Sequence, residues 1–243
     1  MQRVILETTK QPEGKFLLTS EQHHYLKRVL RLEDGDRFIA LNGQGKAWIA
    51  EVAGDSAIII ELIPSPQTEL PYDVTLMVAL PKGNAFDEVV RCCTELGVTT
   101  ILPVISDRTL LKPSPNKLAR WRRIATEATE QSERCFVPTI LNPIAFTTAL
   151  ETIPKENTTL YLCVARGESP HLLSCLSPQN HLIIAIGAEG GWTEKEIESA
   201  VLSGFQPVSL GNRILRAVTA PIVALSLVSA TFEQGMERTA QTR

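Results

Sequence analysis

The stretch from residue 182 to residue 230 decides the fold, and it reads LIIAIGAEGGWTEKEIESAVLSGFQPVSLGNRILRAVTAPIVALSLVSA. Residues 182–186 are apolar and predict a buried strand, which runs into a glycine-rich turn. A second short strand is predicted over residues 207–210, and it leads into Gly211. Because glycine has no side chain in the way, such turns let backbone amides and carbonyls approach a flat ligand closely. The two turns therefore predict a small-molecule site.

The spacing of these glycines excludes two common nucleotide-binding motifs. The first turn is Gly187-Ala188-Glu189-Gly190-Gly191, which is neither GxGxxG nor GxxxxGK followed by Ser or Thr. A turn of this kind also occurs between a strand and a helix with no ligand bound. The second turn, with the basic string that follows it, strengthens the ligand-binding interpretation.

Two motifs carry a resemblance to a known family. The first is Ile186-Gly187-Ala188-Glu189-Gly190-Gly191, and the second, about twenty residues later, is LGNRILRAVTA over residues 210–220. They resemble the SPOUT methyltransferases, and among these the 16S rRNA uridine-N3 methyltransferase family (RsmE type), marked by IGPEGG and LG-x-RILR-x-ETA. Two positions depart from the pattern, since Ala188 replaces a proline and Val218 replaces a glutamate. The resemblance implies an α/β fold with a SPOUT trefoil-knot parallel sheet and an N-terminal PUA-like β-barrel.

The order of predicted elements divides the chain into two domains. Residues 63–71 contain three prolines in nine positions, which predicts a linker. We therefore expect domains at residues 1–70 and 71–243. The first domain reads as short strands with one helix over residues 21–30, capped by Ser20, and this pattern is typical of a small β-barrel. The resemblance implies that this barrel is a PUA-like RNA-binding domain.

The second domain alternates strands and helices, which predicts a parallel sheet. Ser114 and Pro115 open a long helix that is expected to reach about Arg134. Thr193 and Glu196 form a capping box for a later helix. The predicted strands of the whole chain are residues 37–41, 47–52, 56–62, 74–79, 100–105, 159–164, 182–186 and 207–210, and the other helices are residues 86–96 and a last one that starts near Thr219.

The resemblance also implies S-adenosylmethionine as the cofactor. In the family, the two glycine turns and the loop after the preceding strand, here residues 165–168, hold this cofactor. Apolar side chains there would enclose the adenine, and backbone groups would supply its polar contacts. The matching cofactor-binding positions are Ala165, Ile186, Gly187, Gly190, Gly191, Leu210, Gly211, Ile214 and Leu215.

Methylation of uracil N3 requires loss of a proton, because N3–H is a weak acid that stays protonated at neutral pH. Glu189 is the candidate general base, since it lies in the glycine turn. A carboxylate there also offsets the dipole of the following helix, which is an equally good account of it. Arg213 and Arg216 are candidates for stabilising charge on the uracil oxygens or for contacting RNA phosphate, and the alternative is that both are surface charges.

RNA binding is predicted from local charge, since the net charge of the chain is −3. Residues 108–134 hold seven basic and three acidic side chains, and Lys27, Arg28 and Arg31 form a smaller cluster. Such charge also occurs on solvated helix faces. The segment 130–134 matches the EQS-x-R pattern of the family and is expected to line the substrate pocket. The predicted RNA-binding residues are Arg28, Arg31, Arg122, Gln131 and Arg134.

Several classes of protein are excluded by composition. The five cysteines include no CxxC pair, and no cluster of metal ligands accompanies His23 and His24, so no metal is expected. The apolar, uncharged run at residues 217–232 has 16 residues and is too short to span a bilayer. The N-terminus lacks the apolar segment of a secretory signal. We therefore expect a cytoplasmic protein that does not bind membranes.

These observations lead to one functional hypothesis and two alternatives. The hypothesis is methyl transfer from S-adenosylmethionine to N3 of a uridine in the 16S rRNA of the small ribosomal subunit. The resemblance implies a homodimer, and the apolar residues 221–232 are a candidate dimer surface. One alternative is methylation of another RNA position, such as a ribose 2′-O. The other is an RNA-binding or ribosome-assembly protein without catalysis, which the departures at Ala188 and Val218 keep open.

Overall fold

The computed structural model divides the chain into two compact units. The first contains Met1–Glu69 together with Thr126–Val137, and the second contains Leu70–Ala125 together with Pro138–Arg243. Residues 126–137 thus group with the N-terminal unit, although their place in the sequence lies within the second predicted domain. The prolines of the predicted linker lie partly outside the described residues, which are 1–6, 14–64, 68–111, 113–177 and 181–241, with side chains described as far as residue 234.

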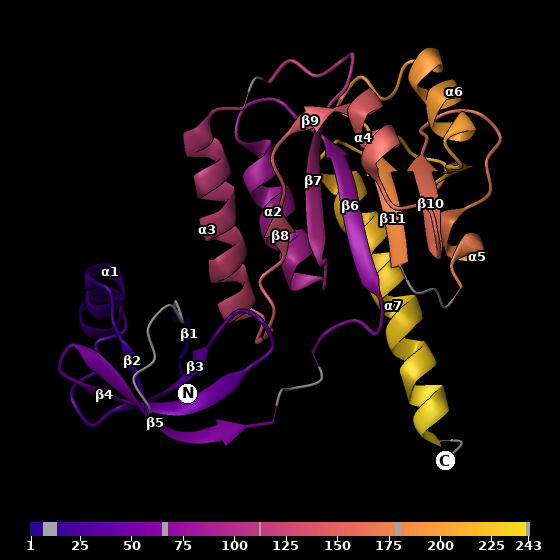
Figure 1. Cartoon of the computed structure of the whole chain (residues 1–243). Helices are drawn as coiled ribbons and strands as arrows, with labels where there is room; N and C mark the ends of the chain where they lie inside the picture. Colours follow the sequence, from indigo (N-terminus) through magenta and orange to yellow (C-terminus); the bar gives the residue numbers. More distant parts are fainter. Residues whose placement is uncertain (7–13, 65–67, 112, 178–180, 242–243) are drawn as a thin grey trace. The chain divides into compact units, whose positions relative to one another are not determined.

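The first unit is built on a five-stranded sheet whose order is β1-β3-β4-β5-β2 (Figure 1). β1 is parallel to β3, and the other neighbours are antiparallel. Alternate side chains such as Phe38, Ala40, Ala50 and Val52 point into one apolar core. The strands are β1 (Arg3–Ile5), β2 (Lys15–Leu17), β3 (Arg37–Leu41), β4 (Ala47–Ala53) and β5 (Ser56–Ile63), so the three predicted strands of this unit are confirmed.

The helix of the first unit begins one residue earlier than predicted and changes type halfway. α1 (Ser20–His24) is capped by Thr19, so the prediction that Ser20 is the cap was wrong. Thr19 is the cap because Gln22 stands three residues later and completes a capping box with it. Gln22 Oε1 accepts from the Thr19 amide at 2.9 Å, and Thr19 Oγ1 accepts from the Gln22 amide at 3.2 Å. The chain continues as a π-helix, η1 (Tyr25–Val29), and Arg31 follows it with a left-handed φ of 58°.

Residues 130–134 hold the first unit together. Arg134 is 2% exposed, and its Nη2 and Nε donate to Oε2 of Glu69 at 2.6 and 2.9 Å. The other oxygen of Glu69 accepts from the Cys135 amide at 3.0 Å. Glu133 forms a more exposed ion pair with Arg3 at 2.7 Å. Through Glu133 and Arg134, this segment therefore binds Arg3 of strand β1 and Glu69.

The second unit is a parallel sheet with the order β12-β10-β11-β6-β7-β8, and β9 also pairs with β7. Every neighbouring pair in it is parallel. The α/β fold is therefore confirmed, whereas the path of the chain through a trefoil knot stays a prediction. The strands are β6 (Asp73–Ala79), β7 (Thr100–Ile105), β8 (Thr139–Ile140), β9 (Ile144–Ala145), β10 (Thr158–Cys163), β11 (His181–Ile186) and β12 (Gln206–Val208).

Helices cover both faces of this sheet (Figure 1). On one face, side chains of α4 and α6 such as Phe146 and Ala200 join Met77 and Ile183 of the strands in one core cluster. α7 lies on the other face, where it contacts α2, α5 and β11. The helices are α2 (Ala85–Glu95), α3 (Pro115–Gln131), α4 (Phe146–Thr152), α5 (Leu172–Cys175), α6 (Glu194–Leu202) and α7 (Thr219–Gln241), of which α4 and α5 were not predicted.

Removing the buried guanidinium should destabilise the first unit. We expect Arg134→Ala to lower the free energy of unfolding by roughly 3 kcal/mol, because it leaves the carboxylate of Glu69 without its charged partner. The matched control is Arg3→Ala, which breaks the more exposed pair with Glu133 and should cost less than about 1 kcal/mol. Chemical denaturation of the three proteins measures both values. Equal costs would show that burial does not strengthen the Arg134 pair.

The stability of the first unit should also depend on pH through Glu130. Burial, opposed by a hydrogen bond from the Ile5 amide at 2.7 Å and reinforced by the charge of Glu127, raises the pKa of the Glu130 carboxyl to about 7. A folded pKa above the unfolded value means that stability declines as pH rises from about 4.5 to about 7. The decline should not exceed about 3 kcal/mol.

Glu130→Gln tests this pH dependence, since its amide oxygen can still accept from Ile5 while the charge is gone. Between pH 4.5 and 7, we expect the unfolding free energy of the variant to change less than that of the unmodified protein. Burial raises the pKa of the Tyr25 phenol and the charge of Glu130 raises it further, so the spectrum of that phenol serves as a second readout. Identical pH profiles for the two proteins would contradict the assignment.

Candidate functional site

The loops that follow the parallel strands gather at one edge of the second sheet. Since β12, β10, β11, β6 and β7 are neighbours and run in the same direction, their carboxyl ends meet at that edge. Ligands of open α/β sheets bind at the carboxyl ends of the strands. The described loop residues that lie there are 80–84, 106–111, 113–114, 164–171, 187–193 and 209–218.

The first glycine turn is closed by backbone packing that a side chain would prevent. A Cβ on Gly187 would lie 3.1 Å from the carbonyl carbon of Gly191, which is tighter than nearly all real contacts of this kind. Gly191 has a φ of 66°, and its amide donates to the Ala188 carbonyl at 2.8 Å. Two of the three predicted glycines thus have conformational reasons of their own to be glycine.

Glu196 links this turn to the loop after β7. The predicted capping box of α6 is confirmed: Thr193 Oγ1 accepts from the Glu196 amide at 3.2 Å, and Glu196 Oε2 accepts from the Thr193 amide at 2.8 Å. The other carboxylate oxygen accepts from the Asp107 amide at 2.9 Å. Glu196 is 5% exposed, so these hydrogen bonds are shielded from water.

Glu189 has both a structural contact and a free oxygen. Its Oε1 accepts from the backbone amide of Lys82 at 2.9 Å, which ties the first turn to the loop after β6. Its Oε2 has no hydrogen-bond partner among the described residues. The side chain is exposed at the sheet edge. The arrangement orients the carboxylate and leaves one oxygen able to accept a proton.

The second glycine turn is tied to the loop after β10. Ser209 donates from its amide to the Pro170 carbonyl at 2.8 Å and accepts from the Leu172 amide at 2.9 Å. Its hydroxyl accepts from the Gly211 amide at 3.0 Å, and Gly211 has a φ of 112°. The structure thus brings the second turn and the third predicted cofactor loop together.

The side chains around these loops suit a flat, partly apolar ligand. Ile214 is 66% exposed, whereas Leu210 and Leu215 are half-buried. A Cβ on Gly167 or Gly191 would meet nothing within 4 Å, so space is open beside both residues. An exposed apolar side chain next to glycine-lined loops offers surface that a ligand would bury.

Two of the predicted cofactor-binding residues, Ile186 and Ala165, differ in the atoms that a ligand could contact. Ile186 is 2% exposed in the core, so only its backbone is available to a ligand. Ala165, at the start of the loop after β10, is exposed.

The predicted RNA-binding arginines fall into two groups. Arg213, Arg216, Arg28 and Arg31 are exposed, and none has a hydrogen-bond or ion-pair partner in the part of the chain that the structure describes. Arg134 is the opposite case, since its guanidinium is buried against Glu69 and presents no surface to RNA. The RNA contact of Arg134 stays a prediction, while in the structure a neighbouring carboxylate takes up its charge.

Arg122 and Gln131 are intermediate cases. Arg122 donates from Nη2 to the Ile140 carbonyl at 3.2 Å, so part of its hydrogen-bonding capacity serves the fold. Gln131 is the last residue of α3 and is exposed.

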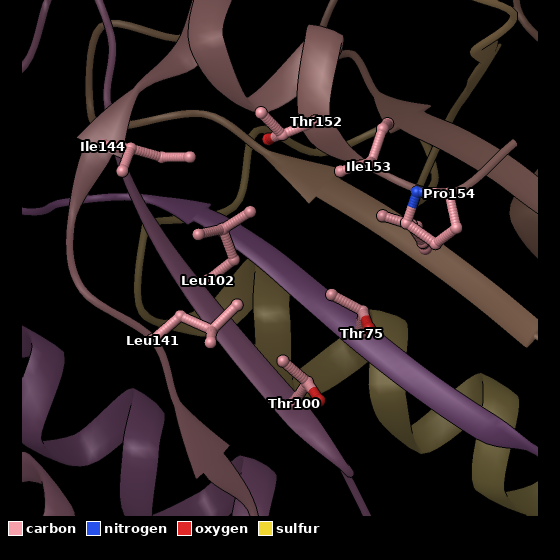
Figure 2. Close-up of a pocket in the computed structure, with 9 residues that line it drawn as sticks. Thr75, Thr100, Leu102, Leu141, Ile144, Thr152, Ile153 and Pro154 are labelled. Carbon is pink, nitrogen blue, oxygen red and sulfur yellow. The ribbon is translucent and has the colours of Figure 1, made fainter.

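A pocket of about 260 Å³ lies elsewhere on the sheet, as Figure 2 shows. Thr75 and Thr100 line it near the starts of β6 and β7, and Leu102, Ile144 and Ile153 contribute apolar surface. Its polar side chains are threonines, which supply neither a base nor a charge. The pocket is therefore not the candidate site, which lies at the carboxyl ends of the strands.

Two further findings bear on binding partners. Within the described residues, no three His, Cys, Asp or Glu side chains are grouped so that they could hold a metal ion. No helix in the described part of the chain has both the length and the apolar character needed to cross a membrane.

Comparison with protein families matches both units. The model of an RNA methyltransferase domain matches residues 68–229, and the model of an RNA methyltransferase PUA domain matches residues 18–63. The chain is also 48% identical over 237 residues to the ribosomal RNA small subunit methyltransferase E of Synechocystis sp., covering 95% of this chain and 78% of that protein. This chain belongs to the ribosomal RNA small subunit methyltransferase E family.

Other members of the family agree with this placement. The enzyme of the same name from Bacillus subtilis is 33% identical over 254 residues, covering 96% of this chain and 98% of that protein. The crystal structure of the Neisseria gonorrhoeae family member, bound to S-adenosylmethionine, superposes with a TM-score of 0.83 at 31% identity, covering 96% of this chain and 98% of that one. The predicted family and the PUA-like and α/β architecture are thereby confirmed.

One departure from the family motif has a structural account. Ala188 is 6% exposed and belongs to the core cluster that contains Phe146 and Trp192, so its side chain packs beneath the turn rather than toward a ligand. Val218 is half-buried just before α7. Nothing in the structure explains why valine stands there.

Sequence reasoning missed three residues that hold the first turn. These are Lys82, through its amide, and Asp107 and Arg108 in the loop after β7. A signal for the last two was available, since they directly follow a predicted strand. The pairing order of the strands, which brings that loop beside the glycine turn, was not readable from periodicity.

Proposed function

We propose that this protein transfers a methyl group from S-adenosylmethionine to N3 of a uridine in the 16S rRNA of the small ribosomal subunit. The observation that carries the proposal is the meeting, at one sheet edge, of two glycine turns with Glu189, Arg213 and Arg216. Among the described residues, one oxygen of Glu189 and both arginines have no partner. Membership of the ribosomal RNA small subunit methyltransferase E family supports it.

The loops of this edge fit the cofactor. S-adenosylmethionine, when bound, supplies an electrophilic methyl group on its sulfonium. The open space beside Gly167 and Gly191 admits a ligand close to the backbone, and the exposed Ile214 offers apolar surface for a base. The cofactor-binding residues we propose are Ala165, Ile186, Gly187, Gly190, Gly191, Leu210, Gly211, Ile214 and Leu215.

Glu189 is the proposed general base for N3. Its Oε1 is held by the Lys82 amide, so the side chain is oriented before substrate arrives. Its free Oε2 takes the N3 proton, which leaves negative charge on the uracil ring. A carboxylate that only offset a helix dipole would need no such orientation across two loops.

Arg213 and Arg216 complete the proposed catalytic set. Negative charge that develops on the uracil oxygens is stabilised by a guanidinium, which makes directional, charge-assisted hydrogen bonds. Both side chains are exposed and have no partner among the described residues, so binding uracil or phosphate breaks no existing contact.

RNA binding in the first unit is proposed for Arg28 and Arg31. They flank the end of the π-helix, and the left-handed backbone at Arg31 fixes where its side chain leaves the chain. Arg122 and Gln131 are weaker candidates, and Arg134 is assigned a structural role.

We also propose a homodimer located in the cytoplasm, where ribosomal subunits are assembled. Much of the apolar surface of α7 is used within the unit itself, since Ala224, Leu225, Val228 and Phe232 are buried there. Among the described side chains of α7, the half-buried Ile222, Val223 and Leu227 are left for a partner subunit.

Transfer of labelled methyl from S-adenosylmethionine to unmethylated small subunits tests the function. N3-methylation blocks base pairing, so we expect label together with a strong reverse-transcription stop at one uridine. Label without a stop would favour a ribose 2′-O product. Cofactor binding without label would favour an RNA-binding protein that does not catalyse methylation.

Two variants test the proposed catalytic roles. Glu189→Gln should lower kcat at neutral pH by roughly 10²-fold or more, and the deficit should narrow as pH rises because uracil then loses its proton to solvent. Arg216→Ala should lower kcat by roughly 10²-fold without unfolding. The matched control is Glu194→Gln, an exposed carboxylate in the first turn of α6. A constant deficit across pH would remove Glu189 from the role of base.

A further inference from the structure

The loop that follows β7 contacts the first glycine turn and the start of α6 through Asp107 and Arg108. Asp107 accepts from Thr193 Oγ1 at 3.3 Å, and its amide donates to Glu196 at 2.9 Å. Arg108 reaches further into the turn. It donates from Nη1 to the carbonyl of Trp192 at 3.2 Å and also to the carbonyl of Gly190.

The aliphatic part of Arg108 also contacts the turn. A Cβ on Gly190 would lie 2.9 Å from Cδ of Arg108 and 3.4 Å from its Cβ. The backbone of Gly190 has no left-handed φ, so the stem of Arg108 is what a side chain at this position would have to displace. The stem of Arg108 therefore packs on the turn while its guanidinium binds two carbonyls.

The loop that carries Arg108 is itself ordered by hydrogen bonds. Ser106 is 5% exposed, and its amide donates to Thr109 Oγ1 at 3.0 Å, while the Thr109 amide donates to the Ser106 carbonyl at 3.0 Å. On the other side, the Trp192 ring stacks on Phe146 at 4.3 Å within the core. Arg108 thus connects an ordered loop to the turn residues that precede the packed Trp192 ring, and these residues have no strand or helix of their own.

We infer that Arg108 is a positioning residue, which holds the carbonyls of Gly190 and Trp192 so that the first glycine turn keeps the geometry that binds S-adenosylmethionine. It acts through the turn and does not touch the reacting atoms. The inference rests on the proposed function for the identity of the ligand. It goes beyond that function by assigning a residue outside both family motifs to the cofactor site.

Direct cofactor binding by Arg108→Ala is the decisive measurement. We expect calorimetry on the full-length protein to show a Kd for S-adenosylmethionine raised about tenfold, which corresponds to about 1.4 kcal/mol. The Michaelis constant for S-adenosylmethionine should rise in parallel, while that for the small subunit stays within about twofold. Arg108→Lys should recover part of the affinity, since it keeps the stem and one charged donor.

A control separates positioning from general destabilisation. Lys155→Ala removes an exposed charge before β10, at the opposite end of the strands, and should leave both constants unchanged. An unchanged Kd in a folded Arg108→Ala protein would overturn the inference. So would a rise in the Michaelis constant for the small subunit alone, which would make Arg108 an RNA contact.

Gly190→Ala provides a second, independent test. Its new methyl group should displace Arg108 and weaken S-adenosylmethionine binding as Arg108→Ala does, so the double variant should bind no more weakly than either single variant. Additive losses would show that the contact between the two residues is not what positions the turn.

Hydrogen exchange distinguishes failure of the inference from failure of the proposed function. Without any ligand, Arg108→Ala should exchange the Gly191 amide faster, because the hydrogen bond of that amide to Ala188 closes the turn. If the unmodified protein failed to bind S-adenosylmethionine, the proposed function would be wrong, and faster exchange would still support the positioning role. Unchanged exchange would overturn that role.

Discussion

Parallel pairing of β11 with β6 on one side and β10 on the other is the constraint on which the site depends. Both pairings extend from the first to the last residue of β11, from His181 to Ile186. Because these strands are parallel, they all end at the same edge of the sheet. A tight hairpin cannot join parallel neighbours, so each strand is followed by a longer connection of its own. The loops after β6 and β7 thereby contact the first glycine turn, although about eighty residues or more separate them from it in the sequence. Weakening the pairing of β11 with β6 or with β10 would displace the loop that follows that neighbouring strand.

Charged side chains at this edge form hydrogen bonds chiefly with backbone amides and carbonyls of neighbouring loops. Glu189 accepts from an amide of the loop after β6, Glu196 accepts from an amide of the loop after β7, and Arg108 donates to two carbonyls of the turn. Loops lack the repeated backbone pairing of strands, so their amides and carbonyls need other partners. Charged partners make shorter and stronger hydrogen bonds than neutral ones. The turn is therefore held in place although it has no regular structure of its own.

The long and strongly patterned elements were predictable from sequence, and the short ones were not. The strands over residues 74–79 and 182–186 are buried on both faces, so their continuous apolar runs are distinctive. β8 and β9 have two residues each, too few to show any periodicity. The start of α1 was misplaced by one residue because two hydroxyl side chains stand next to each other, and only the position of Gln22 distinguishes them.

The same limit applies to the site. Glycine turns could be found because backbone geometry restricts the residue type, whereas the role of an arginine depends on which carboxylate or carbonyl lies beside it. Arg134 and Arg216 both stand in family-like motifs, yet one is buried against Glu69 and the other is exposed without a partner among the described residues.

This difference in burial has a chemical consequence for the arginines. A buried guanidinium that is already paired with a carboxylate has little charge left to stabilise an anion, and moving it would leave the carboxylate unpaired. An exposed guanidinium without a partner keeps its full charge and its paired donors for uracil or phosphate. Among the arginines, pairing thus separates Arg134, which fixes the structure of the first unit, from Arg213 and Arg216 at the sheet edge, which have no partner among the described residues and can meet a developing negative charge.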